Sequence, residues 1–282
     1  MKIVIVGGAS SLAKALLPVL SEFAEVLTAG RTGCDIRMDL AAPASDINLP
    51  SGIDVVINAA ADFGGKDVEN LLRAEDINVL GVLKLCVACH KAQVKQFIQV
   101  STVFALLDQA SRFFNAYALS KRHADEAAQL FCSGFALPLA IIRPSQFYGT
   151  GSTARKHQPF LMSIVDKAER SENIFFYGGN DAKRNFIHVA DVAQVISRVA
   201  QQGVTGSYCC QYPRDISYSE IAAAAVNAFG SNSKVEFVRE QSDIPDNVLP
   251  IDDSLFRLIG YSPQISFATG MAMEASARRA AP

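Results

Sequence analysis

The sequence predicts a doubly wound α/β fold, in which helices cover both faces of a parallel sheet. Short apolar runs without polar alternation recur along the first half of the chain, and longer amphipathic stretches separate them. Strands of this kind are typical of parallel sheets, because both faces of such sheets are buried. Half of the 282 residues are hydrophobic and only 19% are charged, which supplies a large core.

The expected strands and helices alternate along the chain. We expect strands at 2–6, 24–29, 55–59, 96–100 and 139–143. We expect helices at 12–23, 68–78, 79–93, 118–131, 160–170, 187–200 and 219–229. Strands that alternate with helices in this way indicate βαβ units.

A glycine-rich turn joins the first expected strand to the first expected helix, in the segment Gly7-Gly8-Ala9-Ser10-Ser11-Leu12-Ala13. A first glycine allows a tight turn, and a small residue after it lets the backbone approach a pyrophosphate at the positive helix N-terminus. Ser10 and Ala13 replace glycines of the Rossmann dinucleotide fingerprint, but both are small. We expect the cofactor to contact Gly7, Ser10, Ser11 and Leu12, with an ordinary strand–helix turn as the alternative.

Three other segments follow expected strands, at the sheet edge where ligands bind in such folds. Arg31 stands where an NAD site has an acidic residue for the ribose hydroxyl, and arginine suits the 2′-phosphate of NADP. We therefore expect NADP in preference to NAD, although nearby Asp35 leaves NAD open. The adenine is expected beside Asp39 and Leu40, and small side chains that allow close approach of the cofactor are Ala59, Ala60 and Ala61.

A tyrosine and a lysine are spaced four residues apart at the start of an expected helix, in Tyr117-Ala-Leu-Ser-Lys121. Residues at i and i+4 share a helix face. A free phenol titrates near pH ~10, too high for acid–base work at neutral pH, and a neighbouring ammonium is expected to lower that pKa. Thr102, just after the fifth strand, supplies a hydroxyl to hold a substrate oxygen. The three residues together predict a catalytic site.

The composition of the sequence changes after Gly149, where glycine and proline gather. We expect residues 1–150 to form the dinucleotide-binding domain, with 185–206 returning to it. Residues 151–184 and 207–282 are expected to form a smaller substrate-binding region.

Charge and hydropathy exclude several classes of partner. A net charge of −2 gives no basic surface for nucleic acid or anionic membranes, and no apolar run approaches the ~18 residues of a membrane span. We expect a cytoplasmic protein with a small-molecule substrate and no metal site. Two apolar helical regions, 68–93 and 117–131, are candidates for pairing in a homodimer.

The six cysteines are interpreted as buried thiols of a reducing compartment. Cys86-Val-Ala-Cys89-His90 matches the attachment pattern of c-type haem, but it falls within an apolar helix, so we interpret the match as chance.

The chain resembles the extended short-chain dehydrogenase/reductase family, whose members include epimerases, dehydratases and reductases of sugar nucleotides. The resemblance runs nearly from end to end and rests on the segments GGASSLA, DVVINAAA, NVLG, FIQVST, YALSK, RPSQFYG and RNFIHVADV. It implies that Thr102 holds the substrate oxygen, Tyr117 is the acid/base and Lys121 orients the nicotinamide ribose. It also implies that Pro144 and Ser145 flank the nicotinamide and that Arg184 contacts a substrate phosphate.

The sequence departs from the family pattern after the active threonine. The family's 4,6-dehydratases have Asp-Glu there, whereas this chain has Val103-Phe104, so dehydration is disfavoured. Asn185 also replaces an aspartate that many members have.

These features predict an enzyme, an NAD(P)-dependent oxidoreductase of nucleotide-sugar metabolism that acts as a 4-keto reductase or an epimerase. Arg31 favours reduction with NADPH, since an epimerase retains its NAD and needs no outside reductant. Two other hypotheses stay open. One is a non-catalytic NADP-binding regulator or assembly factor, which the missing glycines favour and the complete Thr102, Tyr117 and Lys121 set opposes. The other is a reductase of a smaller carbonyl compound.

Overall fold

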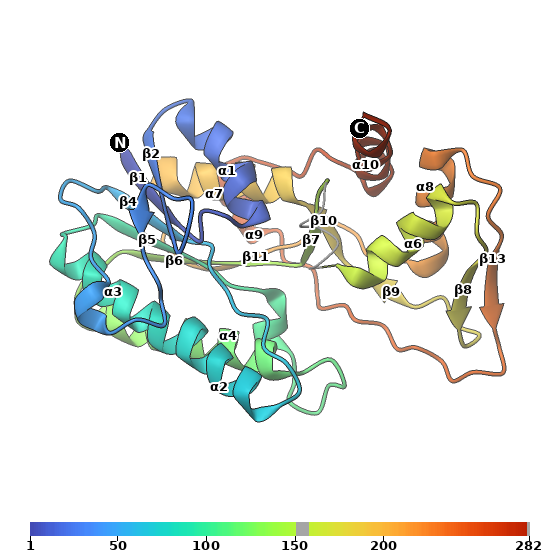
Figure 1. Ribbon diagram of the computed structural model, residues 1–282, viewed down its shortest axis with the longest axis horizontal. Helices are drawn as coiled ribbons and strands as arrows, with labels where there is room; N and C mark the ends of the chain where they lie inside the picture. The colour runs from blue at the N-terminus through green and yellow to red at the C-terminus, as the bar shows by residue number, and fades with distance from the viewer. Residues whose placement is uncertain (151–157, 281–282) are drawn as a thin grey trace. The chain divides into compact units, whose positions relative to one another are not determined.

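The computed structural model describes residues 1–150 and 158–280, so the start of the expected 151–184 segment lies outside the described residues. The chain divides into two units. The first contains residues 1–144, 193–210 and 254–261, and the second contains 145–192, 211–253 and 262–282. Figure 1 shows the elements of both units in chain order.

The first unit is built around a seven-stranded sheet in which every pairing is parallel. Its elements are β1 (Lys2–Val6), α1 (Ser11–Ser21), β2 (Glu25–Gly30), β3 (Ile36–Arg37), the 3-10 turn η1 (Ala44–Asp46), β4 (Val55–Asn58), α2 (Val68–Glu75), the π-helical turn η2 (Asp76–Leu80), α3 (Gly81–Lys91), β5 (Gln96–Val100), the 3-10 turn η3 (Val103–Leu106), α4 (Ala116–Gly134), β6 (Leu139–Pro144), β11 (Gly206–Cys210) and α9 (Ser254–Ile259).

The strand order is β11-β6-β5-β4-β1-β2-β3. The order reverses between β1 and β4, and ligands of such folds bind beyond the carboxyl ends of the strands at that point. Helices α2, α3 and α4 lie on one face of the sheet, and α1 lies on the other with the part of α7 (Val189–Gln202) that belongs to this unit (Figure 1). The predicted doubly wound fold is confirmed.

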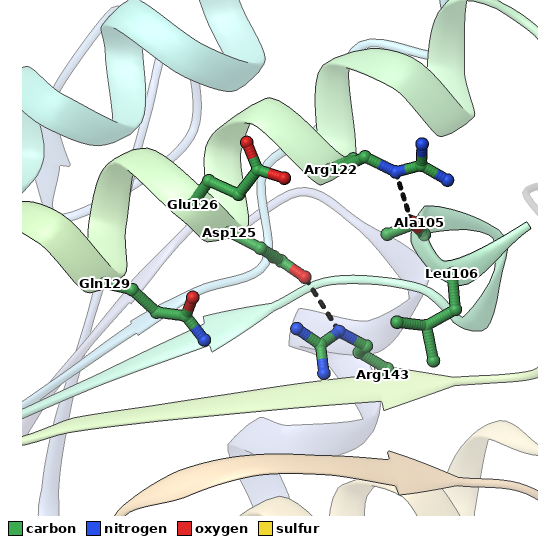
Figure 2. A pocket seen from close by; sticks show the side chains of 7 residues that line it. All are labelled: Ala105, Leu106, Arg122, Asp125, Glu126, Gln129 and Arg143. Carbon is green, nitrogen blue, oxygen red and sulfur yellow. Dashed lines mark hydrogen bonds and ion pairs between the residues drawn. The ribbon is translucent and has the colours of Figure 1, made fainter. Parts of the chain in front are cut away.

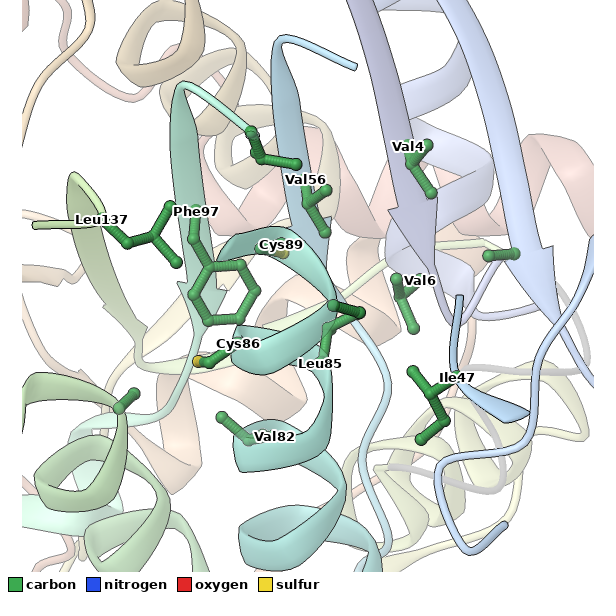
Figure 3. Close-up of a cluster of buried hydrophobic side chains, with 14 of the residues drawn as sticks. Val4, Val6, Ile47, Val56, Val82, Leu85, Cys86, Cys89, Phe97 and Leu137 are labelled. Atoms are coloured by element: carbon green, nitrogen blue, oxygen red, sulfur yellow. The ribbon is translucent and has the colours of Figure 1, made fainter. Parts of the chain in front are cut away.

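One face of the sheet forms a core with α3 and α4. Val4, Val56 and Phe97 project from three strands toward Leu85 and Cys86 of α3 (Figure 3). Each is almost completely buried, and a buried side chain of this size contributes about 1.5–3 kcal/mol to folding. These contacts hold the strands against α3, and they therefore position the residues that follow the strands.

The second unit has three two-stranded sheets and three helices among the residues that the structure describes. Its elements are β7 (Gln146–Tyr148), α6 (Pro159–Glu169), β8 (Ile174–Tyr177), β9 (Lys183–Arg184), β10 (Phe186–His188), the start of α7, β12 (Ile216–Ser217), α8 (Tyr218–Phe229), β13 (Val235–Val238) and α10 (Phe267–Ala280). Fully buried Leu161, Ile221 and Met271 join α6, α8 and α10 in one core.

The structure differs from the sequence expectations in a few boundaries. Residues 207–210 and 254–261 belong to the first unit, because β11 pairs with β6 and α9 packs on β11. The expected helix 187–200 begins instead as strand β10, because Phe186–His188 pairs with β7 before α7 starts at Val189. Cys86 and Cys89 are fully buried in the core. No helix of the described residues is both long and apolar enough to cross a membrane.

Candidate functional site

The glycine turn brings the ends of three strands together. The N–H groups of Gly7 and Gly8, after β1, both donate to the carbonyl of Ala29 in β2, at 2.8 and 3.1 Å. Gly7 has a φ of +84°, and a Cβ atom there would lie 2.7 Å from the backbone nitrogen of Ala60, after β4. Glycine is therefore required at this position by both conformation and space.

Helix α1 starts directly after this turn. The Ser10 hydroxyl accepts a hydrogen bond from the Ala13 N–H at 3.1 Å and so caps the helix. The Ser10 hydroxyl proton and the Ser11 side chain can still donate to an anion at the helix N-terminus. Leu12 and Ala13 are buried in the core, so Leu12 can contact a cofactor only through its backbone.

The two candidate residues that follow β2, Arg31 and Asp35, have different surroundings. Arg31 is exposed. The Asp35 carboxylate accepts from the backbone N–H and the hydroxyl of Thr28, at 2.8 and 2.7 Å. Those two hydrogen bonds hold the pKa of Asp35 below its usual range. The Asp35 carboxylate, which could bind a ribose hydroxyl, is thus already hydrogen-bonded to Thr28, whereas the Arg31 side chain is exposed to solvent.

The expected adenine contacts and the alanines lie near the same edge of the sheet. Asp39 is exposed and accepts from the Ala41 N–H at 3.1 Å. The Leu40 side chain is in the core, so only its backbone can contact a ligand. Ala59, Ala60 and Ala61 follow β4 and are half-buried.

The predicted catalytic residues gather around the end of β5. The Lys121 ammonium is 1% exposed and donates to the carbonyl of Val100, the last residue of β5, at 2.6 Å. Thr102 follows two residues later, is buried, and accepts from the Phe104 N–H at 3.2 Å. Tyr117 and Lys121 both project from the first turns of α4, whose N-cap is Asn115.

The acid–base properties differ from the sequence expectation. Burial lowers the pKa of Lys121 to about 8, and the negative charge of Asp125 opposes this fall. Burial raises the pKa of Tyr117 above its usual value, and the charge of Asp125 raises it further. Lys121 was expected to lower the pKa of Tyr117, but the net shift is upward, because the loss of hydration at the partly buried phenol dominates.

An aromatic side chain that sequence reasoning missed covers Tyr117. The ring of Phe63 stacks on the ring of Tyr117, with 5.0 Å between centroids and 22° between planes. Phe63 is 50% exposed and lies in the loop after β4. A phenylalanine just beyond the alanine run was the signal available in the sequence.

The loop that carries Phe63 is fixed by a buried asparagine. The Asn78 amide accepts from the backbone N–H of Asp62 at 2.8 Å, and it donates to the Asp62 carbonyl and to the hydroxyl of Ser120 in α4. The Asp62 carboxylate accepts from Gly64 N–H and pairs with Arg73 at 2.7 Å. Asn78 lies in the π-helical turn η2. Turns of this kind are rare in proteins overall, but many of those that occur lie at functional sites.

A second missed group lies behind Lys121. Asp125 follows Lys121 by four residues on α4, and Arg143 of β6 pairs with it at 2.8 Å. Both line a pocket of about 360 Å³, whose other lining residues are Ala105, Leu106, Arg122, Glu126 and Gln129 (Figure 2). The i+4 spacing from Lys121 was the sequence signal for Asp125.

The remaining predicted residues lie at the boundary of the units and in the second unit. Pro144 ends β6, and Ser145 begins the second unit with its hydroxyl buried and without a hydrogen-bond partner among the described residues. The Arg184 guanidinium is buried, donates to the carbonyls of Lys183 and Pro245 at 2.7 and 3.2 Å, and hydrogen-bonds the Tyr218 hydroxyl. Burial lowers its pKa. The structure thus places Gly7 beside Ala60, holds Lys121 on the carbonyl of Val100 two residues before Thr102, and puts Ser145 and Arg184 in the second unit. The roles of these residues stay predictions.

Comparisons with known proteins agree with this architecture. The model of the NAD-dependent epimerase/dehydratase family matches residues 3–210. CDP-abequose synthase of Salmonella typhimurium is 22% identical over 80% of this chain and 77% of its own length. Human dTDP-D-glucose 4,6-dehydratase is 25% identical over 69% of this chain, which spans only 59% of that enzyme.

A solved structure gives the same fold. The UDP-glucose 4-epimerase of Thermus thermophilus, in complex with NAD, superimposes with a TM-score of 0.77 at 19% identity, and the match covers 100% of both chains.

Proposed function

The chain belongs to the NAD-dependent epimerase/dehydratase family, and we propose that it is an NADPH-dependent reductase of a 4-keto sugar linked to a nucleotide. The observation that carries the proposal is the arrangement at the end of β5. There the Lys121 ammonium donates to the carbonyl of Val100, which lies two residues before Thr102. Lys121 itself lies one helical turn after Tyr117 on α4. Dehydration is not proposed, because Val103-Phe104 follow the threonine.

The first unit fits a nicotinamide dinucleotide. The close approach of Gly7 to Ala60 leaves no side chain between the turn and the β4 end, and the capped N-terminus of α1 offers N–H groups to phosphates. We propose that Gly7, Ser10 and Ser11 hold the phosphates, Asp39 and the Leu40 backbone the adenine, and Lys121 the ribose. In the second unit, the Ser145 hydroxyl is buried and has no hydrogen-bond partner within residues 1–150 and 158–280, which supports the expectation that it contacts the nicotinamide. When bound, the nicotinamide supplies the hydride.

The preference for NADPH rests on Arg31. Its side chain is exposed beyond β2, while the Asp35 carboxylate is bound to Thr28. A guanidinium binds phosphate through several donors at once, and hydrogen bonds to charged groups contribute about 1.5–3 kcal/mol.

The protein residues divide the chemistry between them. Thr102 donates to the keto oxygen and holds it beside Tyr117. The phenol is protonated at neutral pH, since even a free phenol titrates near pH ~10, and it acts as the acid that gives its proton to the oxygen as the carbonyl is reduced. Its raised pKa opposes the loss of that proton. The Lys121 ammonium stabilises the phenolate that remains. The stack on Phe63 limits rotation of the Tyr117 ring.

A reductant assay tests the proposal. With a panel of nucleoside-diphosphate 4-keto sugars, we expect one NADPH to be oxidised for each product formed, and at least about tenfold slower turnover with NADH. Conversion of the sugar without consumption of added reductant would instead indicate an epimerase. Cofactor binding without turnover of any carbonyl compound would support the regulator or assembly-factor hypothesis.

A smaller carbonyl substrate is a second candidate, because the Arg184 guanidinium already hydrogen-bonds protein groups. If Arg184 also binds a substrate phosphate, Arg184→Ala should raise KM for a diphosphate-linked sugar about 10- to 100-fold, the loss of one charged hydrogen-bonding group. Arg214→Ala, which removes an exposed arginine paired with Glu220, is the control. An unchanged KM in a variant that melts like the wild type would point to the smaller substrate.

Two further proposals concern the setting of the enzyme. We propose a homodimer, supported by exposed apolar side chains on α2 and α4, namely Val68, Leu72 and Leu130. A cytoplasmic location also stays a prediction.

A further inference from the structure

Three side chains of α4 follow one another at intervals of four residues, and the last two of them hydrogen-bond successive residues at the end of β5. Tyr117, Lys121 and Asp125 share one face of the helix. The Lys121 ammonium donates to the carbonyl of Val100, and the Asp125 carboxylate accepts from the hydroxyl of Ser101 at 2.9 Å. Two successive residues at the end of β5, immediately before Thr102, are therefore tied to two successive turns of α4.

The Asp125 carboxylate is almost completely shielded from water. It is 3% exposed, and its Oδ2 atom accepts both from Ser101 and from the Nε–H of Arg143 at 2.8 Å. Its Oδ1 atom is buried and has no hydrogen-bond partner among the described residues. Figure 2 shows the carboxylate and the guanidinium directed at each other along the edge of the pocket. Burial raises the pKa of the Asp125 carboxyl, whereas the charges of Arg143 and Lys121 and the hydrogen bonds from Ser101 and Arg143 favour its ionised form. The ionised carboxylate acts strongly on its neighbours, because water does not screen its charge.

We propose that Asp125 is a positioning residue for the proposed reaction, in which its buried carboxylate keeps Lys121 charged and holds α4 against the strand end that carries Thr102. The inference rests on the proposed function only for its catalytic meaning. The charged and titratable groups around Asp125 are Arg143 on β6 and, on its own helix, Tyr117, Lys121, Arg122 and Glu126. Of these, Arg122, Glu126 and Arg143 line the pocket.

The direction of each effect follows from the sign of the charge. The Asp125 charge favours the ammonium form of Lys121 and disfavours the phenolate form of Tyr117. Without the charge of Asp125, burial would lower the pKa of Lys121 further, and the side chain would lose its charge at a lower pH. Lys121 is charged below its pKa of about 8, so a step that needs the ammonium is lost as the pH rises through that value.

Asp125→Asn tests the role, because it removes the charge and keeps the shape. We expect the alkaline limb of the pH–rate profile to move to lower pH by about one pH unit, because Lys121 loses its charge at a lower pH without the carboxylate. Glu126→Gln is the matched control, since it makes the same chemical change at the next residue, which is exposed and lines the same pocket. Its profile should match the wild type. Asp125→Glu, which keeps the charge, should restore the alkaline limb.

Removal of Asp125 alone leaves Arg143 buried without its partner, which can prevent folding. In that event Asp125→Asn combined with Arg143→Gln takes its place. The reference is then Arg143→Gln alone, which differs from the double variant only in the charge of residue 125, and the Lys121 titration should lie at lower pH in the double variant.

A titration that needs no turnover separates this inference from the proposed function. In the full-length protein labelled with ¹³C at lysine Cε, Lys121 is assigned by the peak that Lys121→Met removes. We expect its titration to move to lower pH in Asp125→Asn and to stay unchanged in Glu126→Gln. An unchanged titration in Asp125→Asn would overturn the inference. Failure of the proposed function would instead appear as an inactive wild type with the Asp125-dependent titration intact.

Discussion

Tyr117→Phe is expected to lower kcat by about 100- to 10,000-fold, the usual contribution of a positioned acid or base. The substitution removes only the phenolic oxygen, so the ring and its stack on Phe63 remain. Because the proposed cofactor contacts come from other residues, the dissociation constant for NADPH should stay within about twofold. Single-turnover kinetics with a saturating cofactor and a separate calorimetric titration measure the two quantities.

Tyr208→Phe serves as the control for this substitution. Tyr208 lies in β11 of the same unit, and its hydroxyl donates to the Thr205 carbonyl at 3.0 Å. Its loss should leave kcat unchanged. Wild-type turnover in Tyr117→Phe would remove Tyr117 from the mechanism, whatever the fold.

Gly7→Ala is expected to weaken cofactor binding at least about tenfold and to lower the free energy of unfolding. A residue with a Cβ atom at φ +84° costs about 1–2 kcal/mol, and the clash with the backbone at Ala59 and Ala60 adds about 1–3 kcal/mol. The backbone cannot rotate away as a side chain can, so the ends of β1 and β4 must separate. Urea unfolding and cofactor titration measure both effects.

Gly33→Ala separates the two causes. Gly33 also has a positive φ, +64°, but a Cβ atom there would meet nothing within 4 Å. The Gly33→Ala variant should lose only the part of the free energy of unfolding that comes from the positive φ, and its affinity for the cofactor should be unchanged. Equal losses in the two variants would show that close packing at Gly7 is unimportant for the cofactor.

The fold was predictable because its signals are local. The apolar residues of the buried strands β1 and β4 follow one another without interruption, and the turn after β1 carries the required glycine. Strand β11 was harder to find, because its sequence GSYCC is short and half-exposed and only its pairing with β6 gives it a place in the sheet. The start of α7 was misread because Phe186–His188 is short and apolar enough for either structure, and only its pairing with β7 makes it a strand.

The candidate site was predictable in its residues but not in its electrostatics. The spacing of Tyr117 and Lys121 indicates that they share a helix face, but not how deeply both are buried. Loss of hydration determines the direction of the pKa shift at Tyr117, and the charge of Asp125 adds to it. Phe63, which covers the ring, lies far from Tyr117 in sequence. Long-range contacts of this kind have no local signal in one sequence.

The π-helical turn η2 places a constraint on how the chain can change length. The extra residue in this turn lets Asn78 hold Asp62 on one side and Ser120 on the other, while α3 continues at Gly81. Deleting one residue between 76 and 80 would turn the following helix by about 100° relative to the preceding one. The apolar stripe of α3 and the amide of Asn78 could not then both keep their partners. Insertions and deletions should therefore be tolerated poorly at this turn, even though its ends lie near the protein surface.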